Sequence, residues 1–187
     1  MNVKLQLLSK IEKVHFFEKG TIISSFFNKI FHKTSDKIIV ISIPTSFIHK
    51  ILGLFRITRR LFRLDMCNVK TVDNGLVIIR NGWVYHYCLE TFNLTKTLKL
   101  RQCKNVLQQS ICKTPEGHLF FGEYGLNPDR NEVNIYKSIN SGKSWSIIYT
   151  FPKNTIRHVH GCYYDKFTNK IWTLTGDVNS ENKIMAS

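Results

Sequence analysis

The stretch Ser138-Ile139-Asn140-Ser141-Gly142-Lys143-Ser144-Trp145 lies between two apolar runs with strand character, Val133 to Lys137 and Trp145 to Phe151. Gly142 can adopt the positive φ that a tight hairpin needs. Ser138 and Asn140 have short polar side chains that can bond to nearby backbone groups and hold the turn. Trp145 opens the second run and can cover the hairpin with a large apolar ring. The stretch therefore predicts a β-hairpin that its own side chains stabilise.

Further short apolar runs, separated by turn residues, extend on both sides of this hairpin. Asn81-Gly82 joins two of them and is a strong hairpin signal. Many short strands with regular turns indicate an all-β sandwich or propeller. The runs are Lys37 to Ile43, Leu76 to Arg80, Trp83 to Leu89, Leu94 to Leu100, Val106 to Lys113, His118 to Tyr124, His158 to Tyr164 and Lys170 to Thr175.

These runs group into four-strand units with a repeat of roughly 40 to 50 residues, the length of a propeller blade. We expect blades over about 67–100, 104–151 and 156–187, the last one incomplete, within a single partial propeller domain over 1–187. The opening, Ile22 to Lys50, is expected to form an earlier blade or part of a closing one. The segment Phe47 to Leu64 fits either a basic amphipathic helix or a strand pair, and the conformation of residues 1–66 stays open.

A closed propeller has at least four blades, so a chain of three to four blades predicts a truncated product or a subunit of a larger ring. Its open blade edge would favour self-association.

Composition and charge limit which binding partners and which cellular compartment the sequence predicts. The chain has 187 residues, 43% of them hydrophobic, and a formal net charge of +14. The excess of basic residues suits an anionic polymer or membrane surface, or simply a solvated basic surface, and no nucleic-acid motif focuses it. No run is long enough to span a membrane, and Met1 to Gly20 lacks a signal-peptide core. Five cysteines without CxxC spacing predict reduced thiols and a cytoplasmic protein.

The hairpin sequence fits the pattern Ser-x-Asp-x-Gly-x-x-Trp with Asn140 in place of Asp, the Asp-box. Three further sequence segments accompany this motif: Phe121-Gly122-Glu123-Tyr124, Ile156-Arg157-His158-Val159-His160-Gly161 and Leu174-Thr175-Gly176-Asp177. Together they resemble the sialidase-like (Asp-box/BNR repeat) β-propeller family of glycosyl-hydrolase-like proteins, many found near polysaccharide biosynthesis genes. The resemblance implies an all-β fold of incomplete propeller type, with four antiparallel strands in each blade.

The resemblance also suggests a site at the channel that inner strands line. Sialidases use a Tyr nucleophile supported by a Glu, an Asp acid and three arginines. By residue type, Glu123, Tyr124 and Asp177 are the catalytic candidates, and Arg157, His158 and His160 are the candidates for binding an acidic glycan. Strand alternation predicts that His158 and His160 point the same way and that Arg157 points to the opposite face. Arg157 is the only arginine in these segments.

Structural roles compete with each of these assignments. The two histidines could contact substrate, act as acid and base, ligate a metal, or only hydrogen-bond between blades. Glu123 and Tyr124 could line the channel without chemistry, Asp177 could cap a turn, and Arg157 could join blades by an ion pair. The sequence favours a site without metal or cofactor.

Three functions therefore remain: a glycoside-hydrolase-like enzyme, a non-catalytic carbohydrate- or protein-binding module, and an inactive truncated remnant.

Overall fold

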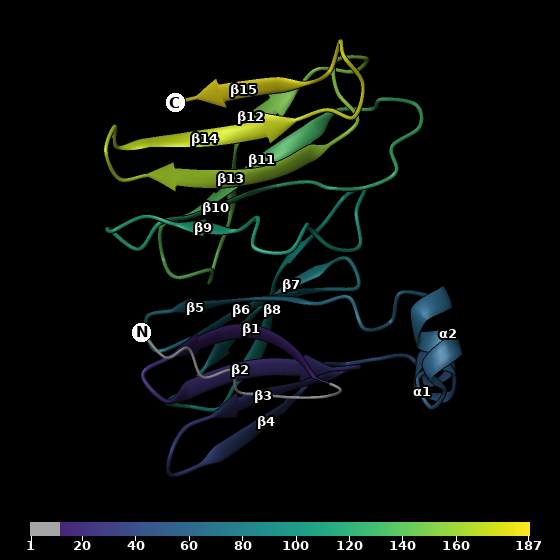
Figure 1. Cartoon of the computed structure of the whole chain (residues 1–187), viewed down its shortest axis with the longest axis vertical. Coiled ribbons are helices and arrows are strands. Elements are labelled where there is room, and N and C mark those ends of the chain that lie inside the picture. Colours follow the sequence, from purple (N-terminus) through teal and green to yellow (C-terminus); the bar gives the residue numbers. More distant parts are fainter. Residues whose placement is uncertain (1–11) are drawn as a thin grey trace, which may run out of the picture. The chain divides into compact units, whose positions relative to one another are not determined.

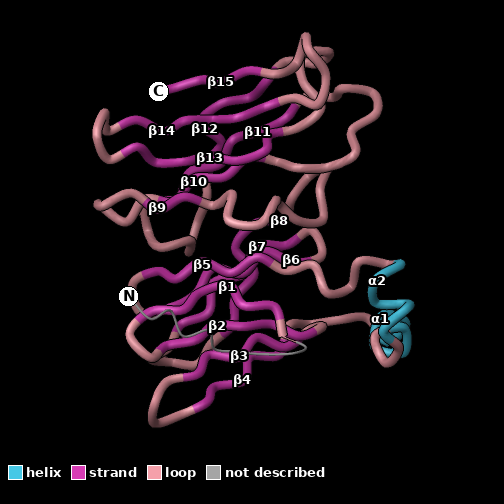
Figure 2. Tube along the Cα trace, viewed as in Figure 1, coloured by secondary structure: helices cyan, strands magenta, loops and turns pink. Residues whose placement is uncertain are grey.

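The computed structural model describes residues 12–187, which form four small antiparallel sheets (Figure 1). Among residues 12–187, helix is present only in the part of the chain that follows the first sheet, drawn in cyan in Figure 2. The chain divides into two compact units, one ending at Met66 and one spanning Cys67–Ser187. The all-β prediction with four-stranded antiparallel blades is confirmed, since three of the four sheets have four strands in sequential order.

The first unit holds one sheet and two short helices. The strands are β1 (Lys13–Glu18), β2 (Thr21–Phe26), β3 (Lys29–Lys33) and β4 (Ile38–Ser42), and they pair in the order β1-β2-β3-β4. The segment that sequence alone left open forms helices α1 (Phe47–Leu52) and α2 (Arg56–Leu61). The Ser46 side chain accepts a hydrogen bond from the backbone N–H of His49 and so caps α1. No helix in residues 12–187 has the length and apolar character that a membrane crossing requires.

The second unit begins with the sheet β5 (Asn68–Val72), β6 (Gly75–Arg80), β7 (Trp83–Cys88) and β8 (Leu94–Lys99). Asn81 and Gly82 join β6 to β7 with φ of 51° and 79°. Two consecutive positive φ values define the turn whose twist matches a hairpin, and Asn-Gly is the pair that adopts it most readily. The predicted hairpin is present at this position.

The next sheet contains β9 (Cys112–Lys113), β10 (Leu119–Gly122), β11 (Val133–Ser138) and β12 (Ser146–Phe151). Its first strand is much shorter than the predicted run from Val106 to Lys113. The last sheet has three strands, β13 (Val159–Asp165), β14 (Lys170–Thr175) and β15 (Lys183–Ala186).

The hairpin between β11 and β12 is closed by its own polar side chains. The Ser138 hydroxyl accepts from the backbone N–H of Gly142 at 2.9 Å, and Asn140 Oδ1 accepts from the N–H of Ser144 at 2.9 Å. Gly142 has φ of 84°, and a Cβ there would meet the side chain of Val77. The Trp145 ring packs edge-on against Phe121 at 4.9 Å. Ser138, Asn140, Gly142 and Trp145 thus all take part in contacts that stabilise the hairpin.

Two apolar cores hold the sheets of the second unit together. The first joins the β5–β8 sheet to the β9–β12 sheet and includes Val77, Val84, Leu119 and Phe121. The second joins the β9–β12 sheet to the β13–β15 sheet and includes Phe120, Ile135, Ile156, Val159 and Cys162. Face-to-face packing of consecutive small sheets is how propeller blades bury their apolar surface.

Gly122 allows β10 and β13 to approach closely, because a Cβ on this residue would overlap the side chain of Val159. The backbone N–H of Val159 also donates to the carbonyl of Glu123 at 2.9 Å. This contact fixes the start of β13 against the end of β10, and the candidate site lies at this junction.

Candidate functional site

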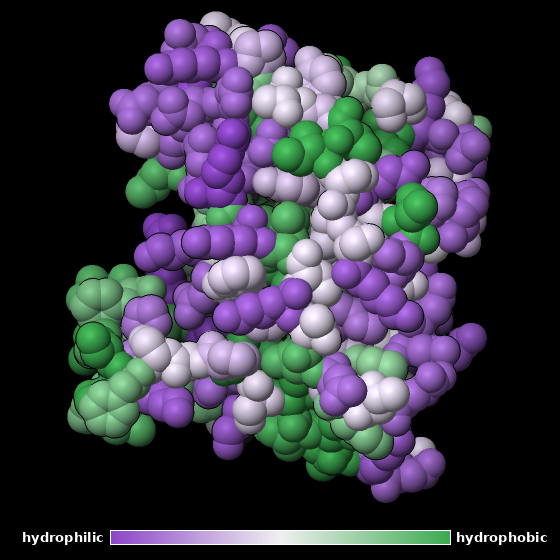
Figure 3. Space-filling model, turned by 180° about the vertical axis from the view of Figure 1, so that it is seen from behind, coloured by the Kyte–Doolittle hydropathy of each residue, from purple (hydrophilic) through white to green (hydrophobic). Residues whose placement is uncertain are grey.

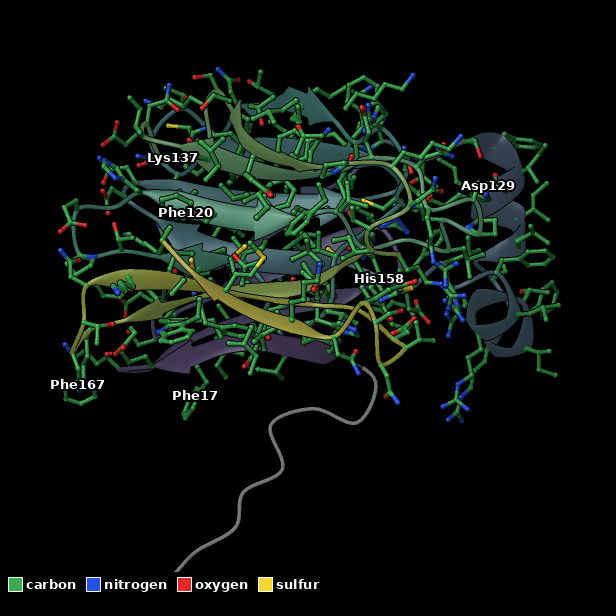
Figure 4. The ribbon with its side chains drawn as sticks, turned by 90° about the horizontal axis from the view of Figure 1, so that it is seen from above. Phe17, Phe120, Asp129, Lys137, His158 and Phe167 are labelled. Carbon is green, nitrogen blue, oxygen red and sulfur yellow. The ribbon has the colours of Figure 1, made fainter. Side chains whose placement is uncertain are left out.

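The candidate site forms where β13 begins and just beyond the end of β14. Figure 4 labels His158 at this end of the sheet and Phe167, in the turn between β13 and β14, at the opposite end. Val159 pairs with Thr175 and Gly161 with Leu174, so His160 is an extra residue in β13. Such a bulge changes the direction of a side chain. It allows His160 to approach the same acceptor as His158.

That acceptor is Asp177, which follows Gly176. Its Oδ1 lies 3.3 Å from Nε2 of His158 and 3.3 Å from Nε2 of His160. Its other oxygen, Oδ2, accepts from Nη1 of Arg157 at 3.1 Å. The two imidazole rings lie 4.8 Å apart and nearly perpendicular. We call Arg157, His158, His160 and Asp177 the histidine–aspartate cluster.

Tyr124 borders the cluster. Its ring centroid lies 4.2 Å from that of His158 and 5.8 Å from that of His160. The structure therefore brings together five of the six residues that the sequence suggested for catalysis or binding. They come from three segments of the chain: the end of β10, the start of β13 and the turn after β14.

Glu123, the sixth candidate, is held by other contacts. It is 3% exposed, and its carboxylate accepts from the backbone N–H groups of Arg101 and Asn134 and from the Tyr136 hydroxyl, at 2.9–3.2 Å. The catalytic role suggested for Glu123 stays a prediction, but these three bonds give its carboxylate a structural role between β8, β10 and β11.

Arg157 does not point away from the two histidines, as strand alternation predicted. β13 begins at Val159, so Arg157 and His158 precede the strand and need not alternate. The Arg157 guanidinium accordingly reaches the same carboxylate as the two histidines.

His158 is nearly inaccessible to solvent. Its side chain is 5% exposed, and Nδ1 lies 2.8 Å from the backbone carbonyl of Gly125. A carbonyl can only accept, so Nδ1 carries a proton and donates it. Nε2 is buried and makes no hydrogen bond to any described residue. The 3.3 Å approach to Asp177 therefore brings these atoms close without bond geometry.

His160 is more accessible. Its side chain is 32% exposed, and Nε2 lies 2.5 Å from the carbonyl oxygen of Gly176. Gly176 has φ of 87°, and a Cβ there would overlap the backbone at Glu181. Glycine is therefore needed at this position to bring the turn after β14 close to the site.

Electrostatics keep Asp177 ionised. Burial alone would raise the pKa of this carboxyl, but the charge of His158, the hydrogen bond from Arg157 and the charge of His160 outweigh burial and lower the pKa below its ordinary value. A carboxyl with a lowered pKa is a carboxylate at neutral pH. Asp177 is thus an acceptor or ligand in this arrangement, and it is poorly suited to donate a proton.

Sequence reasoning missed Glu181. Its Oε1 pairs with Arg130 Nε at 2.7 Å and its Oε2 accepts from the backbone N–H of Arg157 at 2.9 Å. The hydrogen bond from Arg130 is the main reason that the pKa of Glu181 is lowered. Glu181 fixes the backbone just before His158. No motif indicates this role, because Glu181 lies in a turn and its partners are 24 and 51 residues earlier in the chain.

An open hollow of about 600 Å³ lies beside the cluster on the β13–β15 sheet. His160 takes part in both. The other lining residues combine one aromatic ring with several polar groups and a few apolar side chains: Leu107, Tyr163, Leu174, Thr175, Gly176, Asn182, Lys183 and Ile184.

Comparison with solved structures supports the propeller fold. The chain is similar to the extracellular domain of B. thetaiotaomicron BT4673, with a TM-score of 0.54 and 14% identity over 89% of this chain. It is also similar to a chain of the S. cerevisiae complex of Dbp5 with Nup159, Gle1, IP6 and ADP, with a TM-score of 0.52 and 13% identity over 98% of this chain. The chain spans 20% and 47% of the lengths of these two proteins. Such low identity establishes the fold alone.

Neither the models of protein families nor the curated proteins give a match to this chain. The specific likeness to Asp-box sialidases therefore rests on the motifs quoted above. With the structural neighbours, the four antiparallel sheets identify the chain as a β-propeller protein.

Proposed function

We propose that this chain is a non-catalytic binding module that takes an acidic glycan in the hollow beside the histidine–aspartate cluster. The observation that carries the proposal is that neither Glu123 nor Asp177 is suited to its role in a sialidase-like reaction. Glu123 is buried and fully occupied by three donors, so it is poorly placed to activate Tyr124. Asp177 is held ionised, so it is poorly placed to act as an acid. A sialidase-like reaction would need both groups.

The hollow has the chemistry of a sugar site. Tyr163 offers an aromatic ring, while Asn182 and Lys183 offer hydrogen-bond donors, and Lys183 adds a positive charge that suits a sugar acid. The net charge of +14 favours the approach of an anionic chain. An open hollow also suits one face of a polymer better than a small, fully enclosed molecule.

Binding would be tested by titrating acidic oligosaccharides into the protein in the presence of EDTA, with ligand-detected NMR as the readout. We expect binding to wild type and at least about tenfold weaker binding to Tyr163→Ala, which removes the aromatic surface. Tyr149→Ala is the matched control, because Tyr149 on β12 is 45% exposed and Tyr163 is 41% exposed. The proposal fails if no acidic glycan binds or if the two variants bind alike.

The same samples also test for turnover. Incubation of each bound oligosaccharide with wild type should leave it intact. A cleaved product whose formation is lost in Glu123→Gln would show that the chain is an enzyme and would overturn the non-catalytic assignment.

A further inference from the structure

We propose that the histidine–aspartate cluster is a binding site for a divalent transition metal ion, with His158, His160 and Asp177 as ligands. One ligand atom from each of these residues lies within 4.8 Å of the others. Two imidazoles and one carboxylate suit Zn²⁺, Co²⁺ and Fe²⁺. Binding of a metal would go beyond the glycan recognition proposed above and does not depend on it.

The distances fit ligands that share one ion. Two ligand atoms about 2.1 Å from a metal lie roughly 3.0–3.4 Å apart at octahedral or tetrahedral angles. Asp177 Oδ1 lies 3.3 Å from Nε2 of each histidine. An ion bound by all three atoms would replace these two long contacts by three metal–ligand bonds.

His158 is prepared for this role. Its Nδ1 donates to the Gly125 carbonyl, so in the neutral ring the lone pair is on Nε2, which faces Asp177. Metal-bound histidines commonly donate their other ring N–H to a backbone carbonyl in this way, which orients the ring. Because Nε2 is buried and has no hydrogen-bond partner among the described residues, the site leaves one polar atom for a ligand to satisfy.

Asp177 is oriented in the same way. Arg157 holds Oδ2, so Oδ1 remains directed at the two histidines. His160 must exchange its contact with the Gly176 carbonyl for the ion, with the ring proton moving from Nε2 to Nδ1, and its ring is partly exposed. Since His160 also lines the hollow, the remaining coordination positions would face that opening. The ion could then bind water or a ligand oxygen there.

The test is titration of ZnCl₂ into tag-free, EDTA-stripped protein by calorimetry, with Co²⁺ absorption in the visible range as a second readout. We expect one ion per chain and Co²⁺ bands typical of nitrogen and oxygen ligands. Asp177→Asn and His160→Ala should each weaken binding at least about tenfold.

His118→Ala is the matched control and should bind the metal as wild type does, since His118 is a partly buried histidine of the same unit outside the cluster. Asp177→Asn keeps the size of the side chain and should fold normally, which circular dichroism checks. The proposal is overturned if folded wild type binds no ion. It is equally overturned if Asp177→Asn and His160→Ala bind as His118→Ala does.

A separate observation concerns the helical segment of the first unit. Helices α1 and α2 bury none of their residues. Figure 3 shows hydrophobic side chains gathered over this segment, at the lower left of the view. Eight large apolar side chains are between 46% and 80% exposed there: Phe47, Ile48, Ile51, Leu54, Phe55, Ile57, Leu61 and Phe62.

The charges of this segment point to its partner. Lys50, Arg56, Arg60 and Arg63 are all exposed, and residues 47–64 contain no acidic side chain. Apolar residues mixed with exposed basic ones are typical of segments that lie in the interface of an anionic membrane. We infer that α1 and α2 dock onto the surface of an anionic lipid bilayer.

Co-sedimentation with phosphatidylcholine vesicles that contain 30% phosphatidylglycerol tests this inference. Wild type should sediment with these vesicles but not with pure phosphatidylcholine, and Ile57→Glu should lose most of the binding. Phe167→Glu is the control and should bind as wild type, because Phe167 is 87% exposed but lies in a turn of the other unit. If wild type stays in solution, or if Ile57→Glu instead dissociates a dimer seen by light scattering, the membrane assignment is wrong.

Discussion

The hairpin at residues 138–145 and the histidine–aspartate cluster are both rich in polar side chains, but they satisfy them differently. In the hairpin, Ser138 accepts from the backbone N–H of Gly142 and Asn140 from that of Ser144, in each case four residues further along the chain. In the cluster, His158 Nε2 is buried without a hydrogen-bond partner among the described residues. A polar network in which every group has a partner stabilises a turn, whereas one with an unpaired group leaves that group available to a ligand.

The same difference separates the two carboxyls suggested by the sequence. Glu123 has three donors and none of its bonds involves the cluster, so it resembles the hairpin residues. Asp177 is one-third exposed and shares one oxygen between two histidines. An unsatisfied buried group costs about 1–3 kcal/mol. We therefore expect substitutions in the hairpin to lower stability and substitutions in the cluster to affect binding instead.

The largest effect is expected for Gly142→Val. The φ of 84° disfavours any side chain, and a Cβ would overlap Val77 in the first core. Strain and overpacking together should lower the free energy of unfolding by roughly 2–4 kcal/mol. Urea denaturation followed by tryptophan fluorescence would measure this. A loss below about 0.5 kcal/mol would show that the hairpin does not depend on its glycine.

Ser138→Ala should have an intermediate effect. Ser138 is 2% exposed, and its removal leaves the N–H of Gly142 without its acceptor. We expect a loss of about 1–2 kcal/mol in the same denaturation experiment. Ser146→Ala is a control, since Ser146 is exposed in β12 and should change stability by less than about 0.5 kcal/mol. Equal losses in both variants would argue against a special role for the Ser138 hydroxyl.

Asp177→Asn should have a smaller effect that depends on pH. Asp177 is one-third exposed, so solvent screening limits its ion pairs to less than about 1 kcal/mol. Because the pKa is lowered in the folded protein, the stabilisation is present above the ordinary value of 3.8 and is lost as the pH falls through the lowered pKa.

Thermal melts of wild type and Asp177→Asn between pH 7 and pH 3 measure this contribution. The gap between their melting temperatures should be small at neutral pH and should close below about pH 3.8. A gap that widens toward low pH would contradict the charge state assigned to Asp177.

The smallest difference is expected between the thiol labelling rates of Cys103, near the hairpin, and Cys162, near the cluster. Each of these cysteines is buried in an apolar core. Burial raises the pKa of Cys103, in the core that holds Trp145, and that of Cys162, in the core beneath the cluster, each to about 12. Both thiols should react slowly with a disulfide reagent at pH 8, whereas the more accessible Cys88 reacts quickly. Peptide mapping after timed labelling would measure the reaction rate of each cysteine. Faster labelling at Cys162 than at Cys103 would mean that the cluster lies on a loosely packed blade.

Sequence patterns predicted most strands of the second unit because local signals define them. Asn81-Gly82 needs only its own backbone to form a turn, and the 138–145 hairpin makes its bonds within eight residues. The secondary structure of the first unit was harder to predict. The periodicity of residues 47–64 fits a basic amphipathic helix as well as a strand pair, and only the structure shows two helices whose apolar side chains are exposed.

The site was predictable by residue type but not by contact. His158, His160 and Asp177 meet because β13 and β14 pair with a bulge, which the sequence does not signal. Glu123 looked catalytic beside Tyr124, yet its donors come from residues 101, 134 and 136. Partners that lie 11 to 51 residues away decide whether a carboxyl is structural or available, as Glu123 and Glu181 both show.

The most direct test of the account compares the thermal shift caused by ZnCl₂ in wild type, Ser138→Ala and Asp177→Asn at pH 7. We expect Ser138→Ala to melt several degrees below wild type but to keep the full shift, and Asp177→Asn to melt close to wild type and to lose the shift. Reversed behaviour, or a shift that is the same in all three proteins, would contradict the assignment of the hairpin to structure and the cluster to binding.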